Sequence, residues 1–288
     1  MAQDIRPRRS VLYMPGSNAR AMEKARTLAC DSIIFDLEDA VAPDQKGEAR
    51  RLVGEALAAG GYGQRELIVR VNGIDTPWGS DDLAAAIEMN PDAILVPKIS
   101  SGAELERIAS KTGNVTLWAM IETPRAILNL QEIAERRARG VRIDVFVMGT
   151  NDLAKETGAR FVPGRLPMAA WLTLAVTAGR AYGIEIIDGV YNDFKDLEGF
   201  AVECAEGRDF GMDGKTLIHP TQIEGANAAF APGEAEVEQA RRIIDAFSLP
   251  ENKGKGAITV DGKMVELLHA EMAKRTVARA EAIAAMAG

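Results

Sequence analysis

Short apolar runs recur along the chain and alternate with longer stretches of helical periodicity. Runs such as SIIFDL, AILVP and DVFVM are continuous rather than alternately apolar and polar. Continuous apolar runs are typical of strands that are buried on both faces of a parallel sheet. The pattern predicts eight strands, at Ser10–Met14, Ser32–Leu37, Leu67–Val71, Ala93–Pro97, Thr116–Ile121, Asp144–Met148, Ile184–Asp188 and, from a weaker run, Thr216–Ile218.

Helical segments lie between these strands, including Ala19–Ala29, Ser80–Met89, Ala103–Ala109 and Pro124–Arg139. Alternation of strand and helix indicates right-handed βαβ units, and eight such units predict an α/β fold, the (β/α)8 or TIM barrel. A doubly wound open sheet is the alternative. It would be expected to carry a nucleotide-binding fingerprint, and the sequence has neither GxGxxG after the first strand nor GxxxxGK followed by Ser or Thr.

The strand signals end near residue 219, which predicts a barrel catalytic domain over residues 1–230 and an extension over residues 231–288. The extension reads as a helix at Gly233–Phe247, a hinge with the sequence SLPENKGKG, and a tail that begins as a short strand and continues as an amphipathic helix. So short a segment is too small to fold alone. We expect it to act as a helical lid that packs on a neighbouring subunit.

Composition narrows the class of protein. Of 288 residues, 47% are hydrophobic and 26% are charged, which excludes a disordered or collagen-like chain. Lysine and arginine number 34 against 42 acidic residues, so the net charge of −8 gives no electrostatic reason to bind nucleic acid or an anionic membrane. Two cysteines and two histidines argue against a disulfide framework and against Cys/His zinc sites. With no apolar run of membrane-spanning length and no signal peptide, we expect a cytoplasmic enzyme.

Polar residues end nearly every predicted strand. In a (β/α)8 barrel the chemistry lies at the carboxyl ends of the strands. One acidic residue there could simply cap the following helix, but a ring of polar residues is hard to explain by capping alone. In strand order the ring comprises Pro15 and Gly16; Asp36, Glu38 and Asp39; Arg70 and Asn72; Lys98; Glu122; Asn151 and Asp152; Asp188; and His219.

Glu122 and Asp152 carry the strongest signal in this ring. Glu122 ends the run LWAMIE, and Asp152 follows 30 residues later, about one βα repeat. The two carboxylates should therefore face each other on adjacent strand ends. Such a pair suits a hard cation such as Mg²⁺, completed by water and substrate oxygens. The alternative is that both residues are ordinary helix N-caps.

Two basic residues at the strand ends each allow two interpretations. Arg70 lies inside an apolar strand, so its charge must meet an anion: either a substrate carboxylate held bidentately, or an internal salt bridge to Asp36 or Glu38. Lys98 has the position of a Schiff-base lysine, but an ammonium paired with the acidic cluster is the more common arrangement. Asp36, Glu38 and the adjacent Asp39 are expected to hold Lys98, Arg70 or metal-bound water.

Six ordered segments carry a resemblance to a known family. They are FDLEDAVAPDQKGEAR (35–50), VRVNG (69–73), VPKI (96–99), MIETPRA (120–126), GTNDLA (149–154) and GMDGKTLIHPTQI (211–223). Together they resemble the citrate lyase β-subunit-like enzymes, acyl-CoA lyases of the same broad group as malyl-CoA and citramalyl-CoA lyases. The likeness covers almost the whole chain, and it implies a (β/α)8 barrel that assembles as a homotrimer or a dimer of trimers.

The resemblance also implies roles for particular residues. Glu122 and Asp152 would be the ligands of Mg²⁺, with Mn²⁺ as an alternative, and Arg70 would anchor the substrate acid. Contacts to the CoA thioester and the acid would come from Tyr13, Met14, Lys24, Asn151, Ile218 and His219, with Asn18 where related lyases usually have arginine. Asp36, Glu38 and Lys98 would support them. Glu266, where aspartate is common in such lyases, would return a proton from the lid of a neighbouring subunit.

The reaction implied is the reversible cleavage of a 3-hydroxy-acyl-CoA, such as malyl-CoA or its methylmalyl or citramalyl homologue, to acetyl-CoA or propionyl-CoA and an α-keto acid. Alternatives are a (3S)-malyl-CoA thioesterase using the same site, a citryl lyase β-subunit acting on an acyl-carrier protein, and a Schiff-base aldolase using Lys98. A purely structural or binding role would leave the polar ring unexplained.

Overall fold

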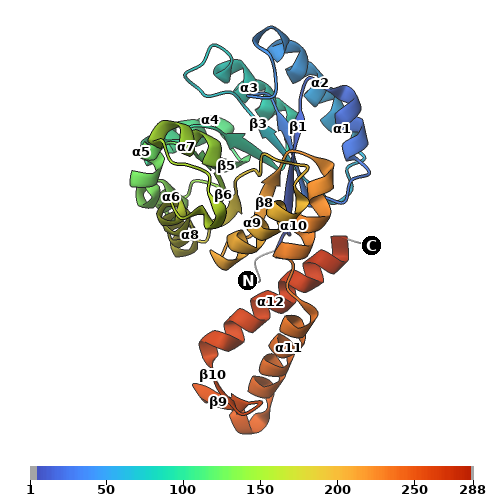
Figure 1. The fold of residues 1–288 in the computed structure, drawn as a ribbon. Helices are drawn as coiled ribbons and strands as arrows, with labels where there is room; N and C mark the ends of the chain where they lie inside the picture. Colours follow the sequence, from blue (N-terminus) through green and yellow to red (C-terminus); the bar gives the residue numbers. More distant parts are fainter. Residues whose placement is uncertain (1–4, 287–288) are drawn as a thin grey trace. The chain divides into compact units, whose positions relative to one another are not determined.

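Eight parallel strands close into a barrel in which each strand pairs with the next along the chain and the last pairs with the first (Figure 1). The computed structural model describes residues 5–286. The barrel strands are β1 (Ser10–Pro15), β2 (Ser32–Asp36), β3 (Glu66–Arg70), β4 (Ala93–Val96), β5 (Thr116–Ile121), β6 (Ile143–Met148), β7 (Glu185–Asp188) and β8 (Gly214–Leu217). The predicted (β/α)8 barrel is confirmed, and each strand lies where the sequence places it to within two residues.

Helices surround the strands, as the ribbon in Figure 1 shows. They are α1 (Ala19–Ala25), α2 (Lys46–Ala59), α3 (Gly79–Met89), α4 (Gly102–Thr112), α5 (Pro124–Leu128), α6 (Leu130–Ala138), α7 (Thr150–Thr157), α8 (Ala169–Tyr182), α9 (Leu197–Asp209) and α10 (Ile223–Phe230). Short 3₁₀ turns lie at η1 (Pro43–Gln45), η2 (Pro163–Arg165) and η3 (Pro220–Gln222). The single helix expected at Pro124–Arg139 is divided, because Asn129 leaves helical geometry and its side-chain amide donates to the Ser100 carbonyl at 2.8 Å.

Side chains of the strands alternate between two apolar layers. One set fills the barrel interior and includes Val11, Ile34, Trp118 and Val145, with Tyr13 packed against it. The other set packs outward against the helices. Both faces of each strand are thus covered, which explains why the strands read as continuous apolar runs.

Residues 231–286 form a second compact unit with its own small core. It contains α11 (Glu234–Ser248), η4 (Pro250–Asn252), the antiparallel strands β9 (Ala257–Val260) and β10 (Lys263–Glu266), and α12 (Leu267–Met286). The β9–β10 turn is Asp261–Gly262, and both residues have positive φ (51° and 76°), as a tight two-residue hairpin requires.

The predicted hinge at residues 248–256 does not separate α11 from the tail. Ile258 and Val265 of the hairpin pack on Ile243 and Phe247 of α11, so these residues form one apolar cluster. The expectation of a hinge at this point is therefore wrong, because burial of the hairpin fixes it to α11. Within residues 5–286, no helix combines the length and the apolar composition needed to cross a membrane.

Candidate active site

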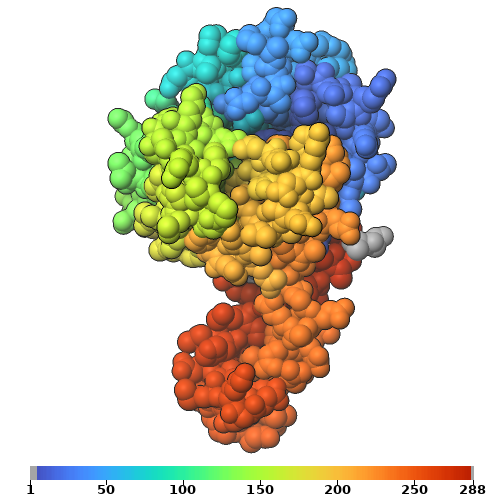
Figure 2. All heavy atoms as spheres, in the orientation of Figure 1, coloured from blue at the N-terminus to red at the C-terminus, as the bar shows by residue number. Residues whose placement is uncertain are grey.

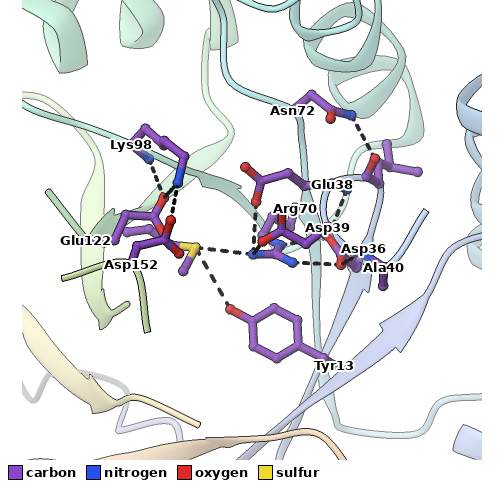
Figure 3. Close-up of polar contacts among 12 residues, drawn as sticks. Tyr13, Asp36, Glu38, Asp39, Ala40, Arg70, Asn72, Lys98, Glu122 and Asp152 are labelled. Carbon is purple, nitrogen blue, oxygen red and sulfur yellow. Dashed lines mark hydrogen bonds and ion pairs between the residues drawn. The ribbon is translucent and has the colours of Figure 1, made fainter. Parts of the chain in front are cut away.

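Two carboxylates converge at the carboxyl ends of the neighbouring strands β5 and β6. Glu122 follows β5 directly, and Asp152 lies in the first turn of α7, after β6. The ammonium of Lys98 lies between them, 2.7 Å from Asp152 Oδ1 and 3.7 Å from Glu122 Oε1 (Figure 3). Thr123 is the N-cap of α5 and Gly149 is that of α7. The N-cap alternative is therefore wrong for both carboxylates, which instead share one position for a cation.

Glu122 is held firmly in this position. Its Oε1 accepts a 2.7 Å hydrogen bond from the backbone N–H of Lys98, whose φ of 56° is left-handed. The backbone of Gly149 also lies close: a Cβ at this residue would be 2.3 Å from the Cβ of Glu122. Burial raises the pKa of Glu122, and the nearby Lys98 ammonium offsets part of the rise. The arrangement gives a fixed, buried carboxylate that gains from a cation beside it.

Lys98 forms the ion pair that was one of its two sequence interpretations. Burial by itself lowers the pKa of Lys98, but the charge of Glu122 and the hydrogen bond to Asp152 outweigh this effect and raise it. A raised pKa keeps the amine protonated, whereas Schiff-base chemistry needs the neutral amine. The acids that follow β2 do not hold Lys98, because they pair with Arg70.

Arg70 ends β3, and its register partner on β2 is Asp36. Two guanidinium nitrogens, Nε and Nη2, each donate to an Asp36 oxygen at 2.7 Å. Of the two predicted alternatives, the structure contains the internal salt bridge. The third nitrogen, Nη1, lies 2.9 Å from Glu38 and 3.6 Å from both Asp39 and the sulfur of Met120. Arg70 can therefore offer a ligand one nitrogen rather than a bidentate edge.

Glu38 is the least satisfied carboxylate in this cluster. Its Oε2 is ion-paired with Arg70 Nη1 but has no hydrogen-bond partner among residues 5–286, because the contact lacks hydrogen-bond geometry. Burial, followed by the charges of Asp39, Glu122 and Asp36, raises the pKa of Glu38 to about 8, although Arg70 acts in the opposite direction. Glu38 can therefore carry or release a proton near neutral pH.

Asp36 titrates in the opposite direction to Glu38. Burial alone would raise the pKa of Asp36, but the Arg70 guanidinium and the backbone N–H groups of Glu38 and Ala40 outweigh it and lower the pKa. One strand end thus carries a permanent anion and, two residues later, an acid that is readily protonated. Such divergent neighbours are typical of sites that transfer protons.

Tyr13 and Met14 lie on opposite faces of β1. The ring of Tyr13 faces the barrel interior, 4.8 Å from the Arg70 guanidinium carbon, and its hydroxyl contacts the Met120 sulfur at 4.0 Å. The Met14 side chain is buried in the outer layer against the helices. Successive strand residues point to opposite faces, so the Met14 side chain does not face the barrel interior, and its contact with the acyl end stays a prediction.

Lys46 supports the β2 end, although its role is not evident from the sequence. Its ammonium donates to the carbonyls of Leu37 and Glu38 and to Asn72 Oδ1 at 2.7–2.8 Å. These bonds fix the loop that presents Glu38 to the barrel mouth. Lys46 lies within the DQKGEAR segment, but its distance in sequence from Asn72 conceals the contact.

The opposite side of the mouth is built from the first turn of α7 and from the loops after β7 and β8. Asn151 and Asn192 exchange two amide hydrogen bonds, of 3.1 and 2.9 Å. Figure 2 shows the segments that carry them side by side. His219 stacks on Phe194 with ring centroids 4.6 Å apart. Asn192 and Phe194 are absent from the predicted site because no strand-end pattern marks the interior of a loop.

The remaining predicted contacts have varied surroundings. Ile218 is exposed, and the ring Nδ1 of His219 caps η3. Lys24 is exposed in the last turn of α1, where Asn18 is the N-cap and accepts from the Ala21 N–H at 3.0 Å. A CoA contact from Asn18 stays a prediction, as do those from Lys24, Ile218 and His219.

Glu266 and Asp188 are two predicted residues that the structure does not pair with Glu122 and Asp152. Glu266 ends β10 in the C-terminal unit, so its approach to any barrel mouth stays a prediction. Asp188 is fully buried, pairs with Arg165 at 2.8 Å and with Lys215 at 3.0 Å, and accepts from the Gly189 N–H. Asp188 does end β7, as the sequence predicts, but its carboxylate is fully paired with internal partners and is not available to a ligand.

The donor set around Glu122 and Asp152 fits a hard divalent cation. Two carboxylates from adjacent strands already converge on one positive charge, and oxygen is the donor that Mg²⁺ prefers. No group of three or more His, Cys, Asp or Glu side chains that could hold a metal ion occurs within residues 5–286. The site predicted from the sequence, with two carboxylate ligands, would have to take its other ligands from water and substrate.

Comparisons with known proteins place the chain among characterised sequences. A model described as HpcH/HpaI aldolase/citrate lyase matches residues 9–220. The chain is 56% identical to a (3S)-malyl-CoA thioesterase of Cereibacter sphaeroides (strain KD131 / KCTC 12085), over 99% of each chain. It is 33% identical to the citrate lyase subunit beta of Escherichia coli (strain K12), over 96% of this chain and 94% of that one.

Among solved structures, the chain resembles the protein CitE from Mycobacterium tuberculosis in complex with magnesium, acetoacetate and coenzyme A. The TM-score is 0.76 at 26% identity, and the match covers 94% of this chain and 97% of the other.

Proposed function

The chain belongs to the HpcH/HpaI aldolase/citrate lyase family, and from that premise we propose that it hydrolyses the thioester of (3S)-malyl-CoA in a divalent-cation site at the barrel mouth. Membership confirms the resemblance to citrate lyase β-subunit-like enzymes that the six motifs indicate. The family includes lyases, so family membership alone does not choose between cleavage of a carbon–carbon bond and hydrolysis of the thioester.

Hydrolysis is favoured over carbon–carbon cleavage by the similarity to a (3S)-malyl-CoA thioesterase, at 56% identity over 99% of both chains. The citrate lyase β subunits match at 33–35%. An acyl pocket is formed by many side chains, so the more similar chain is the better guide to the substrate. Thioester hydrolysis, weighed in the sequence analysis as an alternative, therefore replaces the lyase as the leading hypothesis.

In this proposal Glu122 and Asp152 hold Mg²⁺, or alternatively Mn²⁺. The bound cation would supply Lewis-acid polarisation of the substrate's oxygens. Glu122 is fixed for this role by the Lys98 N–H and by the close backbone of Gly149. The similar protein CitE of Mycobacterium tuberculosis is in complex with magnesium and coenzyme A, which supports the same ligand classes here.

Arg70 and Glu38 complete the chemistry in this proposal. The oxygen of water adds to the thioester carbonyl carbon, the C–S bond breaks, and the proton from water ends on the CoA sulfur. Arg70 Nη1, the guanidinium nitrogen that Asp36 does not bind, would donate to the oxyanion that develops on the carbonyl oxygen. Glu38, with a pKa of about 8, would accept the proton of the water and deliver it to the leaving thiolate.

The test is an assay of the purified chain with (3S)-malyl-CoA in Mg²⁺ and in EDTA. We expect free thiol and malate in equal amounts, dependent on Mg²⁺, without glyoxylate. Glu122→Gln keeps the shape of the side chain and should lower the rate at least about a hundredfold, because even supporting partners of a metal ligand contribute 10–100-fold. Lys155→Met, which removes an exposed charge from α7, is the control and should keep the wild-type rate.

A lyase is the second candidate, supported by the citrate lyase β relatives. It would produce acetyl-CoA and glyoxylate with no free thiol, and phenylhydrazine would trap the glyoxylate. If that product pair dominates, hydrolysis is the wrong reaction and the lyase replaces it. Full activity in EDTA would instead contradict the metal site but not the proposed substrate.

The lid on a neighbouring subunit, the proton return from Glu266 and the homotrimer stay predictions. For the lyase reaction, in which an enolate must be protonated, they make one joint expectation. Glu266→Gln lowers the rate, and mixing it with Glu122→Gln subunits restores activity at sites that combine an intact barrel with an intact lid. Recovery of activity on mixing would show that the lid and the barrel of one site come from different subunits.

A further inference from the structure

Lys98 holds the place between the two carboxylates to which the proposed function assigns a divalent cation. Its Nζ is 2.7 Å from Asp152 Oδ1 and 3.7 Å from Glu122 Oε1, so a single ammonium touches both proposed metal ligands. In Figure 3 the Lys98 side chain folds over the pair. An ammonium and a metal ion cannot occupy the same space, and their like charges repel.

The backbone conformation of Lys98 brings about this placement. Its φ of 56° lies in the left-handed region, which is unfavourable for a residue with a Cβ. In this conformation the backbone N–H of Lys98 donates to Glu122 at 2.7 Å while its ammonium reaches Asp152. One residue thus binds both carboxylates, through its main chain and its side chain respectively.

The two contacts differ in how readily they can be given up. The backbone bond is compatible with a bound cation, because it engages one Glu122 oxygen from the protein side. The contact between the Lys98 ammonium and Asp152 can be broken more easily. The Lys98 side chain is 47% exposed and that of Asp152 is 27% exposed, so the ammonium can move into solvent. Glu122, which is 1% exposed, has no such freedom.

We propose that Lys98 is an internal counter-cation that neutralises Glu122 and Asp152 in the metal-free protein and must be displaced from Asp152 when a divalent cation binds. This inference rests on the metal site of the proposed function. It makes the free protein's affinity for the cation lower than its two carboxylates alone would give. It also means that the pair is not left as two uncompensated charges when the metal is absent.

The test is titration of the purified chain with Mg²⁺ alone, by calorimetry and by thermal unfolding, so that no readout depends on activity. Lys98→Met keeps the bulk and the backbone N–H but removes the charge. Its Mg²⁺ dissociation constant should fall at least about tenfold, because a neighbouring unit charge acts over a few ångströms. Without Mg²⁺ it should unfold at a lower temperature than wild type, and saturating Mg²⁺ should close that difference.

Two further variants keep the result decisive. Lys98→Gly suits the left-handed backbone and tests the same loss of charge if the methionine variant does not fold. Lys155→Met removes one exposed lysine charge from α7, three residues beyond Asp152, and should leave the Mg²⁺ affinity within about twofold of wild type, since exposed charges are screened.

The outcomes separate this inference from the proposed function. If wild type binds Mg²⁺ and Glu122→Gln does not, the metal site stands, and an unchanged or weaker affinity in both Lys98 variants overturns the counter-cation. If neither wild type nor the Lys98 variants bind Mg²⁺, both the metal site and the counter-cation are wrong. An equal gain in Mg²⁺ affinity in Lys155→Met would show that the effect comes from net charge alone, and it would also overturn the counter-cation.

Discussion

Two clusters of buried charge in the barrel are built from the same parts but differ in how completely their charges are satisfied. In one, Asp36 at the end of β2 binds Arg70 through both carboxylate oxygens. In the other, Asp188 at the end of β7 binds Arg165 Nη1 with both oxygens, at 2.9 and 2.8 Å. Each is a strand-end aspartate that holds an arginine in the interior.

The Asp188 cluster is closed. Lys215 is fully buried and pairs with Asp188 at 3.0 Å and with Glu203 at 2.7 Å, while Arg165 also reaches Glu206. Burial would lower the pKa of Lys215, but the charges of Asp188 and Glu203 outweigh it and raise the pKa. Each charge has its partner, so nothing remains to bind a ligand, and the cluster joins the loop around Arg165 to the barrel wall.

The Asp36 cluster is open. Glu38 Oε2 lacks a hydrogen bond within residues 5–286. Arg70 Nη1 has ion-pair contacts to Glu38 and Asp39 and a weak sulfur contact, and the aromatic face of Tyr13 lies beside the Arg70 guanidinium. The comparison teaches that a buried ion pair by itself does not indicate function. What distinguishes a candidate site is hydrogen-bonding capacity that the protein leaves unused at a solvent-facing mouth.

The largest effect on stability should come from the closed cluster. Lys215→Met leaves Asp188 and Glu203 without their shared cation, and breaking a buried pair in this way typically costs about 3–5 kcal/mol in the free energy of unfolding. Urea unfolding followed by circular dichroism measures it. Lys98→Met is the control at the Glu122–Asp152 pair of the barrel mouth, where a half-exposed ion pair should contribute no more than about 1 kcal/mol. Equal losses in the two variants would erase the distinction.

At the mouth, a substitution beside Glu122 should instead affect activity more than stability. Gly149→Ala places a Cβ 2.3 Å from the Cβ of Glu122, so this carboxylate must shift. A displacement of about 1 Å at a catalytic group can lower turnover about a hundredfold, whereas overpacking destabilises by about 1–3 kcal/mol. Gly47→Ala in α2, where the nearest atom is Arg50 Nη2 at 3.8 Å, is the control. If Gly149→Ala hydrolyses the thioester at the wild-type rate, the position of Glu122 is not required for activity.

The smallest expected effect is a pH dependence of stability that arises from Glu38. Its folded pKa of about 8 exceeds its ordinary value of 4.5, so its contribution is fully present below pH 4.5 and is lost as the pH rises through 8. Glu38→Gln stays neutral and should not show this loss. The melting temperature of Glu38→Gln, relative to that of wild type, should therefore rise between pH 5 and pH 9. The rise should be about 2–4 °C for each kcal/mol of stability that wild type loses over this range.

The neighbouring Asp39→Asn, at a carboxylate that is 72% exposed, supplies the comparison for the Glu38 experiment. It also removes one negative charge near Arg70, but from solvent-exposed surroundings. A pH-independent difference between Glu38→Gln and wild type would contradict the titration of Glu38, as would an equal pH-dependent gain in Asp39→Asn.

Much of the fold is readable from the sequence because it depends on local periodicity. Strands buried on both faces must be apolar throughout, and the runs that begin at Ser10, Ser32 and Thr116 lie where the pattern places them. The convergence of Glu122 and Asp152 is also readable, since their spacing matches one βα repeat and barrel closure does the rest. The sequence does not show which of Tyr13 and Met14 faces the barrel interior; in the structure it is Tyr13.

Other features, such as the contacts of residues 248–256 and the pairing of Asp188, could not be predicted from the sequence. The hinge expected at residues 248–256 is rich in Pro, Gly and Lys, yet apolar contacts between the hairpin and α11 fix it as a turn. Asp188 looks like any other strand-end acid, and only the fold shows that Arg165 and Lys215 consume its charge. The sequence shows which charged side chains need partners, whereas the fold decides which partners lie close enough to pair with them.

The sequence by itself determined the barrel, the order of its strands and the meeting of Glu122 and Asp152 at adjacent strand ends, because these follow from periodicity, from spacing and from the handedness of βαβ units. Tertiary structure alone decided which charges remain available. Asp36 commits two nitrogens of Arg70, Lys98 takes the place between Glu122 and Asp152, and Glu38 is left without a hydrogen bond. Pairing of charges depends on separations of a few ångströms between residues that are tens of positions apart, and only the folded chain sets those separations.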